Sequence, residues 1–119
     1  MLDVEIQPIG PAEISGDQPL GKALLTLNNE HVPELSWLAP GRLEHLVKQA
    51  FLARRIGNLN TFLLAFEQDA DYDSPNFLWF RERYRRFVYV DRIVVASSAR
   101  GRGYARKLYD DLFAQALRA

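Results

Sequence analysis

The first half of the chain alternates segments with strand-like and helix-like spacing of hydrophobic residues. Residues 2–9 alternate apolar and polar positions, which predicts a half-buried first strand. Its buried side would carry Leu2, Val4, Ile6 and Pro8. Apolar residues at helical spacing then predict one helix from Leu20 to Asn28 or Asn29, and a second that starts near Pro40 and reaches Ala50.

The middle of the chain predicts a β-hairpin and then a short helix. The hairpin pairs residues 51–56 with residues 61–67 around a turn at Gly57 to Asn60. Ser74 and Pro75 are typical of a helix start, and the aromatic residues after them have helical spacing over residues 75–85. A strand is the alternative for this segment, because aromatic-rich sequences also suit strands.

Residues 87–117 predict a buried strand, a glycine loop and an amphipathic helix, in that order. The strand is a β-branched run of Val88, Val90, Ile93, Val94 and Val95. Gly101 and Gly103 come next, at positions free to take a positive φ. One stripe of the helix is predicted to be buried: Ala105, Leu108, Tyr109, Leu112, Phe113 and Ala116. The opposite stripe would face water: Arg106, Lys107, Asp110, Asp111 and Gln115.

The start of this last helix is unusually cationic. A helix N-terminus already carries about half a positive charge and unpaired N–H donors. Here the sequence adds Arg100, Arg102, Arg106 and Lys107. These charges lower the stability of the helix start unless an anion lies among them, and glycines let backbone N–H groups approach such an anion closely. The pattern therefore predicts a phosphate or pyrophosphate site. The alternative is a glycine loop that only joins strand to helix and carries surface arginines.

Composition narrows the class of protein. A chain of 119 residues with 48% hydrophobic and 25% charged residues forms one small globular domain. Without cysteine it has no disulfides, thiolate nucleophile or zinc–thiolate cluster, and His31 and His45 lack the spacing of metal ligands, so no metal is expected. No apolar run approaches membrane-spanning length and no targeting segment is evident, which predicts a cytoplasmic protein.

Charge is divided between the two ends of the chain. Residues 1–80 hold 11 acidic and 5 basic residues, a net charge of −6, whereas residues 81–119 hold 4 acidic and 10 basic residues, a net charge of +6. The basic part is expected to meet an anion and the acidic part an amine-bearing partner, although the two parts could also attract each other. Contact between nucleic acid and the basic helix face of Arg81, Arg83, Arg85 and Arg86 is a weaker alternative.

The strand and glycine loop also resemble a known family. Ile93-Val94-Val95 followed by Arg100-Gly101-Arg102-Gly103-Tyr104-Ala105 resembles the acyl-CoA signature of the GNAT acetyltransferase superfamily, an apolar strand followed by R/Q-x-x-G-x-G/A. Arg100, Gly103 and Ala105 fill its three fixed places. The predicted order of elements is similar to that family over most of the chain. The resemblance implies an α/β (α+β) fold, with a mixed, mostly antiparallel sheet flanked by helices.

The resemblance also implies a reaction and its residues. These nine residues would bind acetyl-CoA, whose acetyl group passes to a primary amine of a small molecule or peptide. Asp91 would be the general base, since on a regular strand it shares a face with Ile93 and Val95, along which the pantetheine arm lies in the family. The alternative is that Asp91 pairs with an arginine. Asn29, Glu30 and Trp37 would line the acceptor, and the alternative for Trp37 is a core anchor.

The resemblance stops at the last helix. The family's domain continues with further strands and a helix that this chain lacks, which predicts a single domain, residues 1–119, that is incomplete at its C-terminal end. A homodimer whose second copy supplies the missing wall, or a fold without catalysis, are the alternatives. The predicted function is therefore an N-acetyltransferase, and the alternative is a non-catalytic acyl-CoA-binding or assembly module.

Overall fold

A computed structural model describes residues 5–15, 18–30, 37–56 and 61–118 of the chain. In chain order the elements are β1 (Ile6–Pro8), α1 (Pro11–Ile14), α2 (Pro19–Asn29), α3 (Pro40–Gln49), β2 (Leu52–Ile56), β3 (Thr61–Glu67), α4 (Pro75–Arg83), β4 (Val88–Val95), a 3₁₀ turn (Ser97–Ala99) and α5 (Tyr104–Arg118). The fold is α+β, with a four-stranded antiparallel sheet whose strand order follows the chain, β1-β2-β3-β4.

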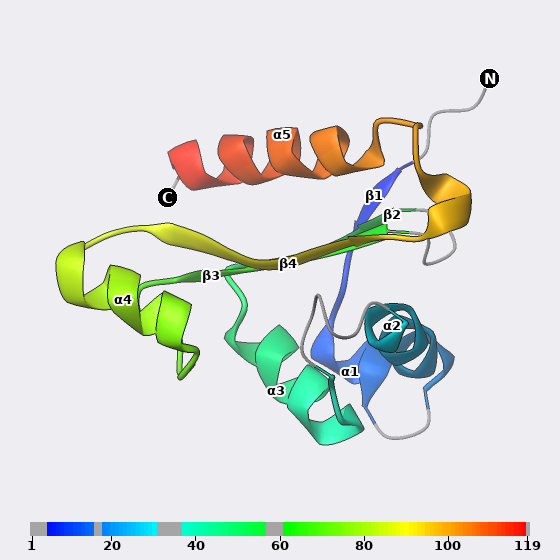
Figure 1. The fold of residues 1–119 in the computed structure, drawn as a ribbon, viewed down its shortest axis with the longest axis horizontal. Helices are drawn as coiled ribbons and strands as arrows, with labels where there is room; N and C mark the ends of the chain where they lie inside the picture. The colour runs from blue at the N-terminus through cyan, green and yellow to red at the C-terminus, as the bar shows by residue number, and fades with distance from the viewer. Residues whose placement is uncertain (1–4, 16–17, 31–36, 57–60, 119) are drawn as a thin grey trace.

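Helices cover both faces of the sheet (Figure 1). Helices α1 to α3 lie against one face and α5 lies against the other, while α4 lies near the end of the sheet where β3 leaves and β4 enters. Within the described residues β4 pairs only with β3, so β4 is an edge strand. The larger part of the core lies on the face under α1 to α3.

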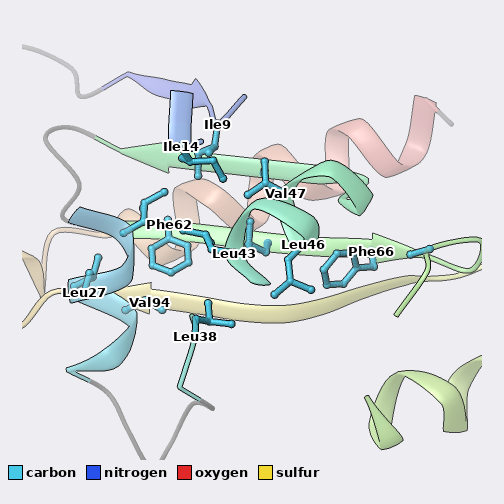
Figure 2. Close-up of a cluster of buried hydrophobic side chains, with 14 of the residues drawn as sticks. Ile9, Ile14, Leu27, Leu38, Leu43, Leu46, Val47, Phe62, Phe66 and Val94 are labelled. Carbon is cyan, nitrogen blue, oxygen red and sulfur yellow. The ribbon is translucent and has the colours of Figure 1, made fainter. Parts of the chain in front are cut away.

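The larger core lies between the sheet and helices α2 and α3 (Figure 2). Phe62 and Phe66 of β3 are fully buried there against Leu43 and Leu46 of α3. The spacing of three and four residues within α3 puts its apolar residues on one face, and the two-residue spacing within β3 does the same for the strand. This core anchors the N-terminal helices to the central strand of the sheet.

The second core lies under α5 on the other face of the sheet. Leu108 and Leu112 of α5 pack there on Leu63 and Ala65 of β3. Because neighbouring residues of β3 point to opposite faces, a single strand supplies both cores and is buried along nearly its whole length. Helix α5 begins above the C-terminal end of β4 (Figure 1).

Two positions on α5 differ from the predicted stripes. Phe113 was predicted to be buried but is 59% exposed, because it lies about a third of a turn from the stripe of Leu108 and Leu112. Asp111 was predicted to face water, yet its carboxylate lies 3.4 Å from the Arg54 guanidinium of β2 at the edge of the interface. The buried stripe is therefore narrower than the prediction, and it is bordered by an ion pair.

Most predicted elements are confirmed. The helices over α2 and α3, the strands of the hairpin and the helical alternative for α4 all occur. The first strand is shorter than predicted, and Pro8 is exposed while Ile9 is buried, because the strand ends there and Ile9 donates its N–H to the Ala53 carbonyl at 3.0 Å. Leu2, Val4 and the turn at 57–60 lie outside the described residues.

The short helix α1 was not predicted. Its sequence has too few residues for a recognisable periodicity, and Gly10-Pro11 indicated only the end of a strand. The Glu13 carboxylate accepts the Gly10 N–H at 2.9 Å, which stabilises the first turn. Ser15 then joins α1 to α3 by donating its hydroxyl to the Glu44 carboxylate at 2.7 Å, and this bond lowers the pKa of Glu44.

Candidate functional site

The connection from β4 to α5 is a tight glycine loop. Gly101 and Gly103 have φ values of +81° and +76°, in the left-handed region that favours glycine. A Cβ on either glycine would meet nothing within 4 Å, so close packing does not require the glycines, but their backbone conformation does. Both are at positions where the sequence predicted a positive φ. The loop thus ends with Gly103, whose carbonyl accepts the first hydrogen bond of α5 from the Lys107 N–H at 3.0 Å.

A pocket of about 280 Å³ lies between this loop and the start of α5. Its walls are Val95, Ala99, Arg100, Gly101, Gly103, Tyr104 and Ala105. The structure thus brings together six of the nine residues predicted to bind acyl-CoA. Arg102 is exposed outside these walls, Val94 is buried in the larger core, and Ile93 packs under α5.

The arginines at the loop are left without acidic partners. The side chains of Arg100, Arg102 and Arg106 form no ion pair or hydrogen bond within the part of the chain that the structure describes. Helix α5 begins at Tyr104 and has no acidic residue in its first turn. Arginine charge, the positive end of the helix dipole and unpaired backbone N–H groups therefore all lie around one pocket, an arrangement that suits an anion.

A β-bulge changes the position of Asp91. Leu64 of β3 pairs with Arg92 and Ala65 pairs with Val90, so Asp91 is the extra residue. Because of this extra residue, Val90 and Ile93 both face α5, whereas Asp91 makes its contacts on the opposite face. The prediction that Asp91 shares a face with Ile93 and Val95 is therefore wrong, because it assumed a regular strand.

The Asp91 carboxylate lies in a buried polar network. One oxygen accepts a hydrogen bond from the Arg92 guanidinium at 2.7 Å, and the other accepts the Tyr72 hydroxyl. The side chains of Asp91 and Arg92 are only 5% and 4% exposed. Arg92 also donates to the Asn28 side chain of α2 at 2.8 Å. Burial, and then the bond to Asp91, raise the pKa of Tyr72 from 10.0 to about 12, so its hydroxyl remains a donor well above neutral pH.

The predicted acceptor residues are dispersed around the end of α2. Asn29 holds the backbone of Leu38 with two hydrogen bonds, of 3.1 Å and 2.9 Å, so its amide has a structural role. It also accepts the Asn28 amide at 3.0 Å, which connects it to the network of Arg92. Glu30 is exposed at the end of α2, and Trp37 is 64% exposed, which rules out the core-anchor alternative for Trp37.

A second pocket, which the sequence did not predict, lies between α4 and the first half of β4. It measures about 410 Å³ and is lined by Phe80, Tyr84, Arg86, Phe87 and residues 88–90. We call it the α4–β4 pocket. The aromatic spacing in this segment was interpreted as the buried stripe of a helix, yet Phe77 is its only fully buried ring, while Phe80 and Tyr84 are 36% and 52% exposed. The five aromatic residues among the eleven from Phe77 to Phe87 were the available signal.

Two further findings concern metal ligands and membrane-spanning helices. Residues 5–15, 18–30, 37–56 and 61–118 contain no group of three or more side chains able to hold a metal. His45 lies 3.8 Å from the Asp71 carboxylate, and His31 lies outside these ranges. No helix among the described residues is long and apolar enough to span a bilayer.

Comparison with known proteins gave a match that covers the C-terminal segment of the chain. Residues 76–119, which hold α4, β4, the glycine loop and α5, match the model of the acetyltransferase (GNAT) family. Comparisons with curated proteins and with solved structures gave no match. The resemblance noted in the sequence is confirmed over this segment, and the α+β fold is consistent with it. A family match of this kind indicates an acyltransferase in general terms.

Proposed function

We propose that the chain is an N-acyltransferase that moves an acetyl group from acetyl-CoA to a primary amine. The observation that carries the proposal is the pocket of about 280 Å³ at the glycine loop, because it places the unpaired Arg100 beside a helix N-terminus within the segment that matches the GNAT family. A pyrophosphate is the anion that fits this charge and this backbone.

The donor would bind along β4 and the loop. Arg100 and Arg102 pair with the pyrophosphate, and the backbone N–H groups from Gly101 to Ala105 donate to it. The pantetheine arm then follows residues 93–95, as the resemblance implies. This route leads from the loop along β4 towards the bulge, so the thioester would come to lie near Asp91.

The reaction is a direct transfer. The amine nitrogen attacks the thioester carbonyl, a C–N bond forms, the C–S bond breaks and the CoA sulfur leaves as a thiolate that takes up a proton. We propose Asp91 as the base that takes the proton from the amine, directly or through water. Its place in a bulge supports this role, because bulges occur preferentially beside active sites. Tyr72 stays protonated, so it orients the carboxylate and does not compete as a base.

Asn29, Glu30 and Trp37 would form one wall of the acceptor site. The exposed Trp37 ring offers an apolar contact, Glu30 a charge for an amine, and Asn29 acts indirectly by holding Leu38. We further propose a single domain over residues 1–119, which acts in the cytoplasm and forms a homodimer only where a second copy contributes to the site.

One observation favours a second candidate function. The Asp91 carboxylate is engaged by both Arg92 and Tyr72, an arrangement that also suits a purely structural pair. If Asp91 has only that role, the same loop would serve a non-catalytic acyl-CoA-binding or assembly module.

Titration calorimetry with acetyl-CoA and with CoA tests donor binding. We expect both to bind, and Arg100→Ala to weaken binding about tenfold through the loss of a charge-assisted hydrogen bond. Arg83→Ala is the matched control, since Arg83 stacks on Trp79 at 4.1 Å on α4 and takes no part in the loop. Equal losses from both substitutions would indicate a diffuse basic surface, and no binding by either ligand would refute both candidate functions.

Release of free CoA thiol from acetyl-CoA then separates enzyme from binding module. The assay uses a panel of amines that includes a polyamine, an aminoglycoside, an amino acid and a peptide. Amine-dependent thiol release supports the enzyme, whereas tight donor binding with no release for any amine supports the module.

A further inference from the structure

The α4–β4 pocket has the properties of a small-molecule site. Its volume of about 410 Å³ lies within the range of pockets that bind compounds of metabolite size. The rings of Phe80, Tyr84 and Tyr89 contribute to its walls, and Phe80 lies 6.0 Å from Tyr84 and 5.9 Å from Tyr89 between ring centroids. Exposed rings gathered around one hollow indicate a surface that an apolar group covers.

We propose that this pocket binds the acceptor, and that the acceptor is a small amine that carries an apolar side chain and a carboxylate, such as an aromatic or branched amino acid. This proposal rests on the proposed function, because it names the substrate class of the same reaction. Three properties of the pocket support it: its apolar walls, its cationic mouth and its distance from the bulge.

The charge around the pocket selects among amines. Arg86 lines the pocket and forms no ion pair or hydrogen bond with any described residue. Neighbouring Arg85 is likewise unpaired within the described ranges, and the carboxylate of Glu82 lies 3.7 Å from Arg83. A polyamine or aminoglycoside would bring several positive charges close to the unpaired Arg85 and Arg86, which would repel them. A carboxylate would instead pair with Arg86.

The position of the pocket fits an acceptor of limited length. Val90 lines the pocket and directly precedes Asp91 in β4. Val88 and Asp91 are three residues apart, which is about 10 Å along an extended strand. The amine of an aromatic amino acid lies closer than this to its ring, so the ring fits beside Val90, the lining residue next to Asp91, while the amine reaches the bulge.

Calorimetry on the whole chain tests the pocket directly, with L-phenylalanine and L-phenylalaninamide as probes. The amide keeps the ring and the amine but lacks the carboxylate. We expect phenylalanine to bind about tenfold more tightly than the amide, as a charge-assisted pair would give. Arg86→Gln should remove this preference, and Arg85→Gln should keep it, because Arg85 does not line the pocket.

A separate substitution tests the contact between the ligand and the Tyr84 ring. Tyr84→Ala should weaken binding of both probes severalfold, and the circular dichroism spectrum should stay unchanged because the Tyr84 ring is 52% exposed. Equal affinity for acid and amide in the unmodified chain, or an Arg86→Gln variant that keeps the preference, would overturn the proposal. Absence of binding by both probes would overturn it as well.

The thiol-release assay distinguishes failure of this proposal from failure of the proposed function. Binding of phenylalanine without acetyl transfer to any amine of the panel supports the pocket and refutes the enzyme. Acetyl transfer to spermidine but not to phenylalanine supports the enzyme and refutes the pocket. Two other occupants of the pocket would also refute the proposal. The first is an acyl chain, which would be shown if hexanoyl-CoA displaced phenylalanine with an affinity that depends on Tyr84. The second is another copy of the chain, which would be shown by a dimer mass that phenylalanine does not change.

Discussion

Asp91 and Arg92 are adjacent charged residues that are almost completely buried in an edge strand. Removing two charges from water is costly, and their mutual attraction compensates only when further hydrogen bonds satisfy them. Here Tyr72 bonds to the carboxylate and Asn28 bonds to the guanidinium, from two different parts of the chain. The pair therefore fixes the position of β4 relative to α2 and to the loop that follows β3.

Replacing Asp91 by Asn should test both roles of the carboxylate. The substitution leaves the Arg92 charge buried with Asn28 but without its anion, so we expect the free energy of unfolding to fall by about 3 kcal/mol. Where the variant still folds, the rate of acetyl transfer should fall at least about a hundredfold. Urea unfolding and the thiol-release assay measure the two effects.

A surface carboxylate gives the control for Asp91→Asn. Asp73 pairs with Arg42 at 3.2 Å, but its side chain is 87% exposed. Asp73→Asn should therefore change the free energy of unfolding by less than about 1 kcal/mol. Equal effects of the two substitutions would contradict the assignment of Asp91 to a buried ion pair.

Tyr72 should make the stability of the protein fall in alkaline solution. Its pKa is about 12 in the folded chain against 10.0 for an unperturbed tyrosine, so its contribution is complete below pH 10 and is lost as the pH rises to 12. Tyr72→Phe should make this decline shallower in urea unfolding curves at pH 9 to 12. Tyr84→Phe, which removes an exposed hydroxyl, should leave the slope unchanged.

At the scale of elements, the glycine loop and the helix after it are the part of the site that the local sequence determines most directly. Gly103 adopts a left-handed conformation, which costs little free energy for glycine but is unfavourable for a residue with a Cβ atom. That requirement is local, and the sequence therefore revealed it. The walls of the α4–β4 pocket depend instead on how α4 packs against the edge of the sheet.

Gly103→Ala should separate backbone strain from packing. A Cβ at Gly103 would meet nothing within 4 Å, so we expect a loss of stability of about 1–2 kcal/mol from φ alone, together with weaker CoA binding. Gly41 in α3 also has open space around it, and its φ is ordinary, so Gly41→Ala should stabilise the chain by up to about 1 kcal/mol. Thermal unfolding and calorimetry with CoA compare the two, and equal stability changes would contradict the strain argument.

The elements that the sequence predicted well are those with long, regular patterns. α2, α3, β3 and α5 each show a clear period, and Ser74-Pro75 marks the start of α4. The bulge at Asp91 left a signal that a regular-strand interpretation overlooks: the apolar spacing changes from two residues, between Val88 and Val90, to three between Val90 and Ile93. The contacts of Arg92 with Asn28 could not be predicted, because 64 residues separate them.

At the scale of the whole molecule, the division of charge between residues 1–80 and residues 81–119 persists in the folded chain. The ion pair between β2 and α5 joins Arg54 to Asp111. Arg54 is a cation of the acidic part and Asp111 an acid of the basic part, so this pair does not offset the net charge of either part. Arg100, Arg102 and Arg106 have no acidic partner in the described ranges. Mutual attraction between the two parts therefore does not account for the cations around the loop.

Self-association through β4 should depend on salt in a characteristic direction. Antiparallel pairing of two β4 edges would place Arg85 and Arg86 of one copy near Arg100 and Arg102 of the other, so like charges would meet at both ends. We expect a monomer by light scattering in dilute buffer, and a growing dimer fraction towards 1 M NaCl, where the screening length falls to about 3 Å. A dimer that dissociates as salt is added would contradict this edge-to-edge arrangement.

The bulge at Asp91 also bears on how this strand could have arisen. The residues on either side of it already point to the faces that an unbroken ladder would give them, with Val90 and Ile93 toward α5 and Tyr89 and Val94 toward the larger core. Asp91 is thus equivalent to a single inserted codon in an otherwise regular strand. Deleting it would leave every other side chain of β4 on its present face. A single genetic step is therefore enough to add the proposed base to this sheet or to remove it.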